Sequence, residues 1–417
     1  MATTSEMVLT EERARSQATG PEFVAMLATC MAMAALSIDV VLPAFGDMRE
    51  SFGLAADSTR VSWVITAFFL GLAVGQVVYG PLSDRFGRKP MLFVGLGIYV
   101  AGAAAAALTT SLPALIACRV LWGIGAAAPR SLALAMARDS FEGERMARTM
   151  SHVMATFILV PVFAPLIGSG LMALAPWRVV FWLPVAAAVT LGIWSVLRMP
   201  ETLPPAERRS VAPSALFEAA RAVLRSRTTL AYGLAVTCLF GVMTSYIGSC
   251  ELIIDEVFGY GDLFPVIFGL LALTLGLGSM LNAALVTRFG LHRLLRTGAV
   301  YTVATASLLA VVALATGGEP PFWLFCVLVA VMLPGIAMLI PNSNTAAMAP
   351  VAHVAGMAAA LLGTVSTGGG ALLGAVVDSA FDGSITPFAL GALAFASLAA
   401  ASIIVLGRPV GSPSALR

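Results

Sequence analysis

Charged side chains are scarce in this sequence of 417 residues. Lys and Arg together number 24 and Asp and Glu number 22, so charged residues make up 11% of the chain, against about 25% in soluble globular domains. Apolar residues make up 59%, and the mean hydropathy is +0.93. A soluble fold of this size cannot bury that much apolar surface, whereas a protein with lipid as its solvent can expose it. The composition therefore predicts an all-α polytopic membrane protein.

Patterns that bind metals, nucleotides or nucleic acids are also missing. The five cysteines fall in apolar runs without Cys-x-x-Cys or Cys/His spacing, so we interpret them as small apolar residues and predict no metal site. No glycine-rich loop carries the lysine of an ATP-binding loop, and no Ser/His/Asp arrangement suggests catalysis. A net charge of +2 gives no reason to expect a nucleic-acid partner. We predict neither an enzyme nor a bound cofactor.

Apolar runs that are long enough to cross a bilayer occur twelve times, since about 20 residues suffice for one crossing. They lie near residues 22–45, 61–80, 90–109, 113–137, 149–174, 178–198, 229–250, 263–286, 295–316, 322–346, 354–377 and 386–407. The tripeptide Arg85-Phe86-Gly87 recurs as Arg288-Phe289-Gly290, which indicates a duplicated six-helix unit. We predict an N-terminal tail, a six-helix bundle, a connector rich in proline and arginine, a second bundle and a C-terminal tail, at 1–20, 21–198, 199–228, 229–407 and 408–417.

The distribution of basic residues sets the expected orientation. With the N-terminus inside, 19 of the 24 Lys and Arg residues lie on inner segments and 3 on outer segments. This split follows the positive-inside rule. It predicts a multi-pass protein of the inner (plasma) membrane with both termini in the cytoplasm.

A loop rich in charge and glycine separates the second and third spans. It reads Gly80-Pro81-Leu82-Ser83-Asp84-Arg85-Phe86-Gly87-Arg88-Lys89-Pro90. Here the chain resembles the major facilitator superfamily, whose signature at this place is G-x-L-[SA]-D-R-x-G-R-[KR]. The resemblance implies the major facilitator fold, with twelve transmembrane helices in two six-helix bundles around a central cavity that opens to one side at a time. It also implies a cytoplasmic gate formed by Gly80, Asp84, Arg85, Gly87, Arg88 and Lys89.

Elementary chemistry accounts for the residue types in this loop. Gly80 allows close helix packing and Gly87 suits a tight turn, while the basic residues bind the anionic inner leaflet or pair with acids. At the inner end of the fourth span, Asp139 is a candidate partner of Arg88, with a solvated loop acid as the alternative. A positive-inside anchor alone explains the basic residues but not Asp84.

Two ionisable residues, Asp39 and Arg119, lie inside predicted spans, which makes each a candidate for function. Asp39 lies six residues before the outer end of the first span near Phe45, and Arg119 six residues after the start of the fourth span at Pro113, so both are about 9 Å below the outer face at 1.5 Å per residue. Opposite charges at one depth can share a cavity and offset the cost of burial. We expect Asp39 to carry a coupled proton beside Arg119. A purely structural ion pair and a snorkelling Arg119 are the alternatives.

The residues around these charges resemble the drug:proton antiporter branch of the family, specifically its bicyclomycin/chloramphenicol-resistance type. That type has a first-helix acid followed by Leu-Pro and an R-x-x-Q-G-x-G pattern on the fourth helix, where this chain has Trp122 in place of Gln. Pro161, Pro165 and Gly168 in the fifth span resemble the antiporter motif G-P-x-x-G-G. The resemblance implies proton-coupled efflux of small, mostly apolar molecules such as chloramphenicol-type drugs. The alternative is a proton-coupled transporter of a specific metabolite or siderophore with the same fold.

Fewer residues in the second half point to function. Glu251, near the outer end of the seventh span, is a second candidate for proton coupling, with an interfacial surface residue as the alternative. The side chains that we predict to line the substrate cavity are Trp122, Phe68, Phe163, Tyr246 and Asn342. Packing is the alternative role for Trp122 and Asn342. We expect a monomer in the lipid bilayer that binds a small-molecule substrate and protons and is driven by the proton gradient.

Overall fold

The computed structural model of the chain describes residues 19–208 and 213–406. Every regular element in these ranges is helical, as the composition predicted. The N-terminal tail (apart from Thr19 and Gly20), part of the connector and the C-terminal tail lie outside the described residues.

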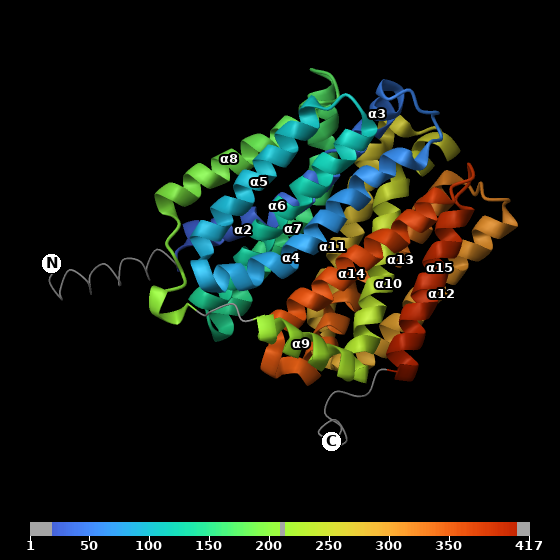
Figure 1. Ribbon diagram of the computed structural model, residues 1–417. Coiled ribbons are helices and arrows are strands. Elements are labelled where there is room, and N and C mark those ends of the chain that lie inside the picture. The colour runs from blue at the N-terminus through green and yellow to red at the C-terminus, as the bar shows by residue number, and fades with distance from the viewer. Residues whose placement is uncertain (1–18, 209–212, 407–417) are drawn as a thin grey trace.

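The helices fall into an N-terminal half and a C-terminal half (Figure 1). The N-terminal half contains α2 (Pro21–Asp39), η1 (Leu42–Ala44), α3 (Phe45–Ser51), η2 (Thr59–Ser62), α4 (Trp63–Phe86), α5 (Arg88–Leu108), α6 (Leu112–Ser140), α7 (Gly143–Met172) and α8 (Val179–Arg198). The connector contains η3 (Pro205–Glu207) and α9 (Pro213–Arg225). The C-terminal half contains α10 (Arg227–Leu252), η4 (Ile253–Val257), η5 (Gly261–Leu263), α11 (Phe264–Phe289), α12 (Leu291–Ala315), α13 (Phe322–Met348), η6 (Ala349–Val354), α14 (Ala355–Ser379), α15 (Thr386–Ala401) and η7 (Ser402–Leu406).

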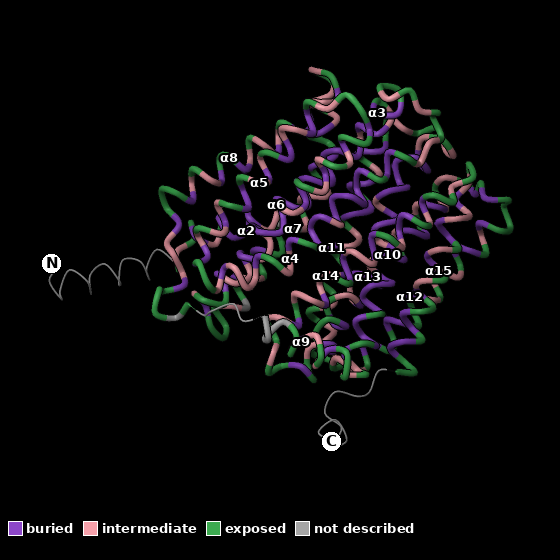
Figure 2. The backbone as a smooth tube through the Cα atoms, viewed as in Figure 1, coloured by how far each residue is buried: buried purple, intermediate pink, exposed green. Residues whose placement is uncertain are grey.

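Twelve crossing helices result, as predicted. By length and composition, 11 continuous helical stretches of the described chain can cross a membrane, and one of these, Phe322–Ser379, has 58 residues. The backbone at Val351 inside it is not helical, so this stretch contains two crossings, α13 and α14. Large apolar side chains such as Leu197 and Val376 are exposed on the outside of the bundle, and Figure 2 shows buried residues along its interior. This pattern suits contact with lipid.

Glycine allows neighbouring helices to approach closely within each half. A Cβ atom added to Gly71 of α4 would collide with the carbonyl group of Val120 on α6, and one added to Gly123 of α6 would collide with that of Phe68 on α4. Small residues at such crossings are the expected packing device of membrane helices. The resulting α4–α6 pair is a closely packed centre of the N-terminal half.

The two halves are in contact from one end of the molecule to about its middle. We call the end that contains α3 the outer end and the end that contains the connector the inner end; in Figure 1 the helices of the halves converge toward α3 and diverge toward the connector. The main contacts between halves pair α4 with α14 and α7 with α11. On α4, Gln76 donates a 3.4 Å hydrogen bond to Thr367 of α14. Among the described residues, α4 makes no hydrogen bond to the C-terminal half between residue 77 and its end. The molecule is therefore joined from its outer end to about its middle.

Candidate functional site

The charged loop at the inner end is a tight turn between α4 and α5. Gly87 has a φ of +102°, which only glycine adopts readily, and a Cβ atom there would lie 2.7 Å from a carboxylate oxygen of Glu201. The predicted turn role of Gly87 is therefore confirmed. A Cβ atom on Gly80 would have no neighbour within 4 Å, so the close packing that we expected at Gly80 is absent.

Arg88 joins three helices at this turn. Its Nε donates to Asp139 of α6 at 2.9 Å, and its Nη1 donates to Ser83 of α4 at 2.7 Å and also to Asp84. The side chain of Arg88 is 10% exposed and that of Asp139 19%, so the pair is only partly screened by water. The expected contact between Arg88 and Asp139 is present. Arg85 lies over the ring of Phe86 instead.

The connector completes this network, which the sequence did not reveal. Glu201 accepts hydrogen bonds from the backbone N–H groups of Arg88 at 2.9 Å and Lys89 at 3.1 Å. These are two of the four N–H groups that have no partner within a helix at its first turn, and a carboxylate is also favoured there by the helix dipole. The Nζ of Lys89 donates to the carbonyl of Met199 at 2.8 Å. The only feature of the sequence that could have indicated this contact is an acidic residue just after the sixth span.

Asp39 and Arg119 are both buried, at 4% and 0% exposure, but they do not form the expected ion pair. The guanidinium of Arg119 donates to the carbonyls of Val64 at 2.9 Å and Ser37 at 2.8 Å. The Ser37 carbonyl lies in the last turn of α2, where carbonyls lack helical partners. The described residues offer Asp39 no ion pair. Arg119 therefore fixes the end of α2, two residues before Asp39, instead of neutralising it.

Aromatic rings enclose the Arg119 guanidinium. It lies 4.6 Å from the ring centroid of Phe68 and 4.7 Å from that of Trp122, and both side chains are fully buried. Trp122 also packs edge-on against Tyr99 and Phe181. These contacts favour the packing alternative for Trp122 and correct the cavity-lining position predicted for Phe68, because both belong to the core of the N-terminal half.

The other predicted cavity residues differ in their surroundings. Asn342 donates to Asn282 of α11 at 2.6 Å, so it bonds a neighbouring helix, as its packing alternative supposed. Tyr246 is 4% exposed and stacks on Phe268. Phe163 of α7 is 53% exposed.

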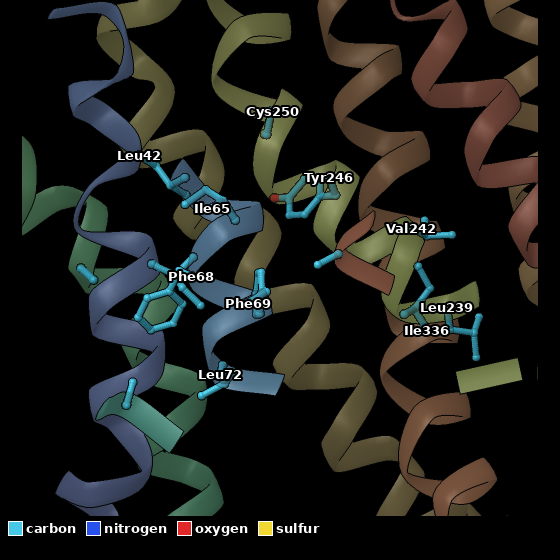
Figure 3. Close-up of a cluster of buried hydrophobic side chains, with 14 of the residues drawn as sticks. Leu42, Ile65, Phe68, Phe69, Leu72, Leu239, Val242, Tyr246, Cys250 and Ile336 are labelled. Atoms are coloured by element: carbon cyan, nitrogen blue, oxygen red, sulfur yellow. The ribbon is translucent and has the colours of Figure 1, made fainter. Parts of the chain in front are cut away.

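An apolar cluster bridges the halves next to Tyr246 (Figure 3). In this view Leu42 and Ile65 of the N-terminal half lie close to Tyr246 of the C-terminal half, whereas the Phe68 ring points into the N-terminal half and Leu239, Val242 and Ile336 lie farther into the C-terminal half. The ring of Phe69 lies 5.3 Å from that of Phe240 across the boundary. The region between the halves is thus predominantly apolar and aromatic.

Gly168 is the part of the predicted antiporter motif with a clear structural effect. A Cβ atom on Gly168 of α7 would collide with the carbonyl of Val40, the residue after Asp39. Pro161 and Pro165 lie inside α7, which continues through both. The motif therefore brings α7 against the break that follows α2.

Glu251 forms an ion pair between the two halves at the outer end. Arg49 of α3 donates to both of its carboxylate oxygens, at 2.9 and 2.7 Å, and both residues are about 95% buried, at 4% and 5% exposure. Ser62 of η2 donates to the carbonyl of Gly248 on α10 at 2.8 Å. We call the contact formed by Arg49, Ser62, Gly248 and Glu251 the outer seam. Glu251 is therefore not an interfacial surface residue.

Comparisons with known proteins agree with this architecture. A family model described as Major Facilitator Superfamily matches residues 27–375. An uncharacterized MFS-type transporter, YdgK of Bacillus subtilis, is 27% identical over 380 residues, which cover 89% of this chain and 91% of that protein. A bicyclomycin resistance protein homolog of Haemophilus influenzae is 25% identical over 91% of this chain and 94% of its own. Multidrug resistance protein D of Escherichia coli is 32% identical over 43% of this chain and 45% of its own.

Solved structures show the same fold at lower identity. A D-xylose–proton symporter has a TM-score of 0.77 with 13% identity, and the match covers 94% of this chain and 98% of that one. The human organic anion transporter MFSD10 has a TM-score of 0.66 with 18% identity, covering 93% and 100%. At this identity the similarity describes architecture and not substrate.

Proposed function

The chain belongs to the major facilitator superfamily, and we propose that it exports small, mostly apolar molecules, including antimicrobial drugs of the chloramphenicol type, in exchange for protons. It is a multi-pass membrane transporter and not an enzyme. One observation carries the proposal: Asp39 is a buried carboxyl without an ion-pair partner in the described chain, at the end of α2 beside an apolar boundary between two halves. The names of similar multidrug and bicyclomycin resistance proteins support the substrate class.

The pattern of contacts supports an inward-facing arrangement. The outer seam and the apolar cluster join the halves at one end. At the other end, the gate residues Asp84, Arg88 and Lys89 bond only to the N-terminal half and the connector, within the described ranges. In our proposal this gate binds the C-terminal half when the inner end closes. A substrate then enters from the cytoplasm or the inner leaflet.

Asp39 carries the proton in the proposed cycle. A protonated Asp39 releases its proton toward the cytoplasm when the drug occupies the apolar boundary, and it takes a new proton from outside after the drug has left. A proton gradient supplies about 2.3 kcal/mol per charge per 100 mV and about 1.4 kcal/mol per pH unit. Arg119 acts as a positioning residue, because it holds the Ser37 carbonyl and with it the end of α2.

Membrane location, orientation and the role of Glu251 complete the proposal. We place the protein in the inner (plasma) membrane as a monomer with cytoplasmic termini, because basic residues concentrate on the inner segments. Glu251 serves the outer seam with Arg49 in this proposal, and it affects proton coupling through that ion pair.

Energised inside-out vesicles test the proposal. Internal acidity is followed with a quenched acridine dye while chloramphenicol and other drugs are added. We expect drug-dependent proton release with the wild type, loss of release with Asp39→Asn, and normal release with Asp47→Asn, which changes an exposed acid of α3. Release that survives in Asp39→Asn would move the coupling carboxyl elsewhere. No release with any drug in well-expressed wild type would favour a specific metabolite or siderophore as substrate.

A further inference from the structure

We propose that Asp378 is a second protonation site of the transporter, which is ionised while the outer end is open and takes up a proton from the outside before the outer seam can close. This inference rests on the alternating access proposed above. It assigns a role to a carboxyl that the sequence motifs did not identify.

Asp378 lies in the last turn of α14, at the outer end, and is 4% exposed. The hydroxyl of Ser249 on α10 donates to its Oδ1 at 2.6 Å. No ion pair to Asp378 is found in the part of the chain that the structure describes. Glu251, two residues after Ser249, has Arg49 as its counter-charge. An ionised carboxylate buried without such a partner costs several kcal/mol, so the protonated acid fits the closed arrangement.

The position of Asp378 links its exposure to the outer seam. The carbonyl of Gly248 accepts the hydrogen bond from Ser62 of the N-terminal half, while a Cβ atom on the same Gly248 would collide with Oδ2 of Asp378. The short helix η2, which ends at Ser62, packs against both α10 and α14. Separation of the halves at the outer end removes η2 from this pair of helices. Water then gains access to the place where Asp378 lies.

The neighbouring elements bring few charges that compete with this role. Helix α15 has no titratable residue. The titratable groups on the outer half of α10, on η2, on η4, on α13 and in the loop after α14 are Tyr246, Cys250, Glu251, Arg60, Asp255, Glu256, Cys326 and Asp382. The other titratable groups of α10, namely Arg227, Tyr232 and Cys238, lie on its inner half. Of the three cations on outer segments, Arg49 is paired with Glu251, Arg178 donates to the carbonyl of Thr109 in the N-terminal half, and Arg60 is exposed and forms no ion pair within the described ranges. A proton from outside is therefore the available source of neutralisation for Asp378.

The proton balance of this step is simple. With the outer end open, the Asp378 carboxylate binds one proton from external water and becomes a neutral acid, which the closing seam buries. When the outer end reopens, the acid returns the proton to the same side. Asp378 thus moves no net charge across the membrane. It makes closure of the outer end depend on external pH, separately from the proton that Asp39 carries.

The native Cys250 gives a readout that needs no drug. Cys250 is 1% exposed and lies on α10 between Ser249 and Glu251. Full-length protein in sealed, right-side-out membranes is treated with a membrane-impermeant maleimide at about pH 6 and about pH 8, and modification of Cys250 is measured by mass spectrometry. Labelling is expressed relative to Asp378→Asn at the same pH, because the thiol itself reacts faster at higher pH.

We expect the labelling rate of wild type, relative to that of Asp378→Asn, to be higher at about pH 8 than at about pH 6. The rise can reach about a hundredfold, since each of the two pH units changes the ratio of ionised to neutral carboxyl tenfold. Asp378→Glu keeps a titratable group and should retain the pH effect. Asp382→Asn, in the exposed loop after α14, is the matched control and should behave as wild type.

Equal labelling of wild type and Asp378→Asn at both pH values would overturn the inference, as would a pH effect in wild type that Asp378→Glu loses. The drug assay with Asp39→Asn is independent of this measurement. Failure of drug transport with an intact pH effect on Cys250 would contradict the proposed substrate class alone, and the reverse result would contradict the role of Asp378 alone.

Discussion

The inner and outer ends of the molecule use similar ion pairs for different connections. At the inner end, Arg88 bonds to Asp84 and Asp139, both within its own half. At the outer end, Arg49 bonds to Glu251 of the opposite half. In this arrangement an ion pair within one half stabilises that half alone, whereas a pair between halves stabilises only the state in which they touch. The placement of buried charges thus distinguishes the end at which the halves are joined from the end at which they are separate.

Breaking the outer pair should give the largest effect. Glu251→Gln leaves Arg49 buried without its counter-charge, which costs about 3–5 kcal/mol in a buried pair, and only the closed outer seam bears that cost. We expect faster labelling of Cys250 from the outside at both about pH 6 and about pH 8, with thermal stability of the N-terminal half little changed. Exchange of the two residues, Arg49→Glu with Glu251→Arg, should restore slow labelling. Unchanged labelling in Glu251→Gln would show that the pair does not hold the outer end closed.

Breaking the hydrogen bonds of Arg88 at the inner end should lower the stability of the protein instead of opening the outer end. Arg88→Ala removes three side-chain hydrogen bonds that link α4, α5 and α6, and a hydrogen bond to a charged group contributes about 1.5–3 kcal/mol. We expect a lower melting temperature in detergent and no increase in Cys250 labelling. Arg85→Ala is the control, because Arg85 lies over the adjacent Phe86 ring and forms no ion pair within the described residues. Increased outer labelling without loss of stability would contradict the contrast between the two ends.

The smallest effect should come from the connector. Glu201→Ala removes the acceptor for two backbone N–H groups at the start of α5, and loss of a helix cap costs about 1 kcal/mol. The melting temperature should fall less than in Arg88→Ala. Glu201→Gln keeps an acceptor oxygen and should lie between Glu201→Ala and wild type. A fall as large as that of Arg88→Ala would mean that the connector, and not the ion pairs, holds the turn.

Hydropathy and local motifs predicted the features that depend on short stretches of chain. The twelve spans follow from the length of apolar runs, and the pairing of Arg88 with Asp139 follows from their positions at the same end of neighbouring spans. Gly87 was predictable because its tight turn is local. Each of these inferences needs only the height of a residue along its helix.

The direction in which a residue faces was harder to predict. Asp39 and Arg119 lie at similar depth, yet Arg119 bonds to backbone carbonyls and the two charges do not pair. A helix that is apolar all round gives no periodic pattern from which a facing direction can be read. For the same reason the sequence did not predict the ion pair of Arg49 with Glu251, 202 residues away. It also did not predict that Asp378 packs against Gly248. Their roles in transport stay predictions.

The repeated turn has a consequence for how the two halves share the work of each cycle. Gly87 and Gly290 both have positive φ angles, of +102° and +78°, and in both turns an arginine lies over the next phenylalanine ring, at 5.1 and 5.5 Å. Within the described residues, only the first turn bears ion pairs. The first turn is thus stabilised by ion pairs, and the second is a turn without them. A change in ionic strength at the inner end, which weakens exposed charge pairs, should therefore affect the partly exposed Arg88–Asp84 pair of the first turn, whereas the second turn has no ion pair to weaken within the described residues.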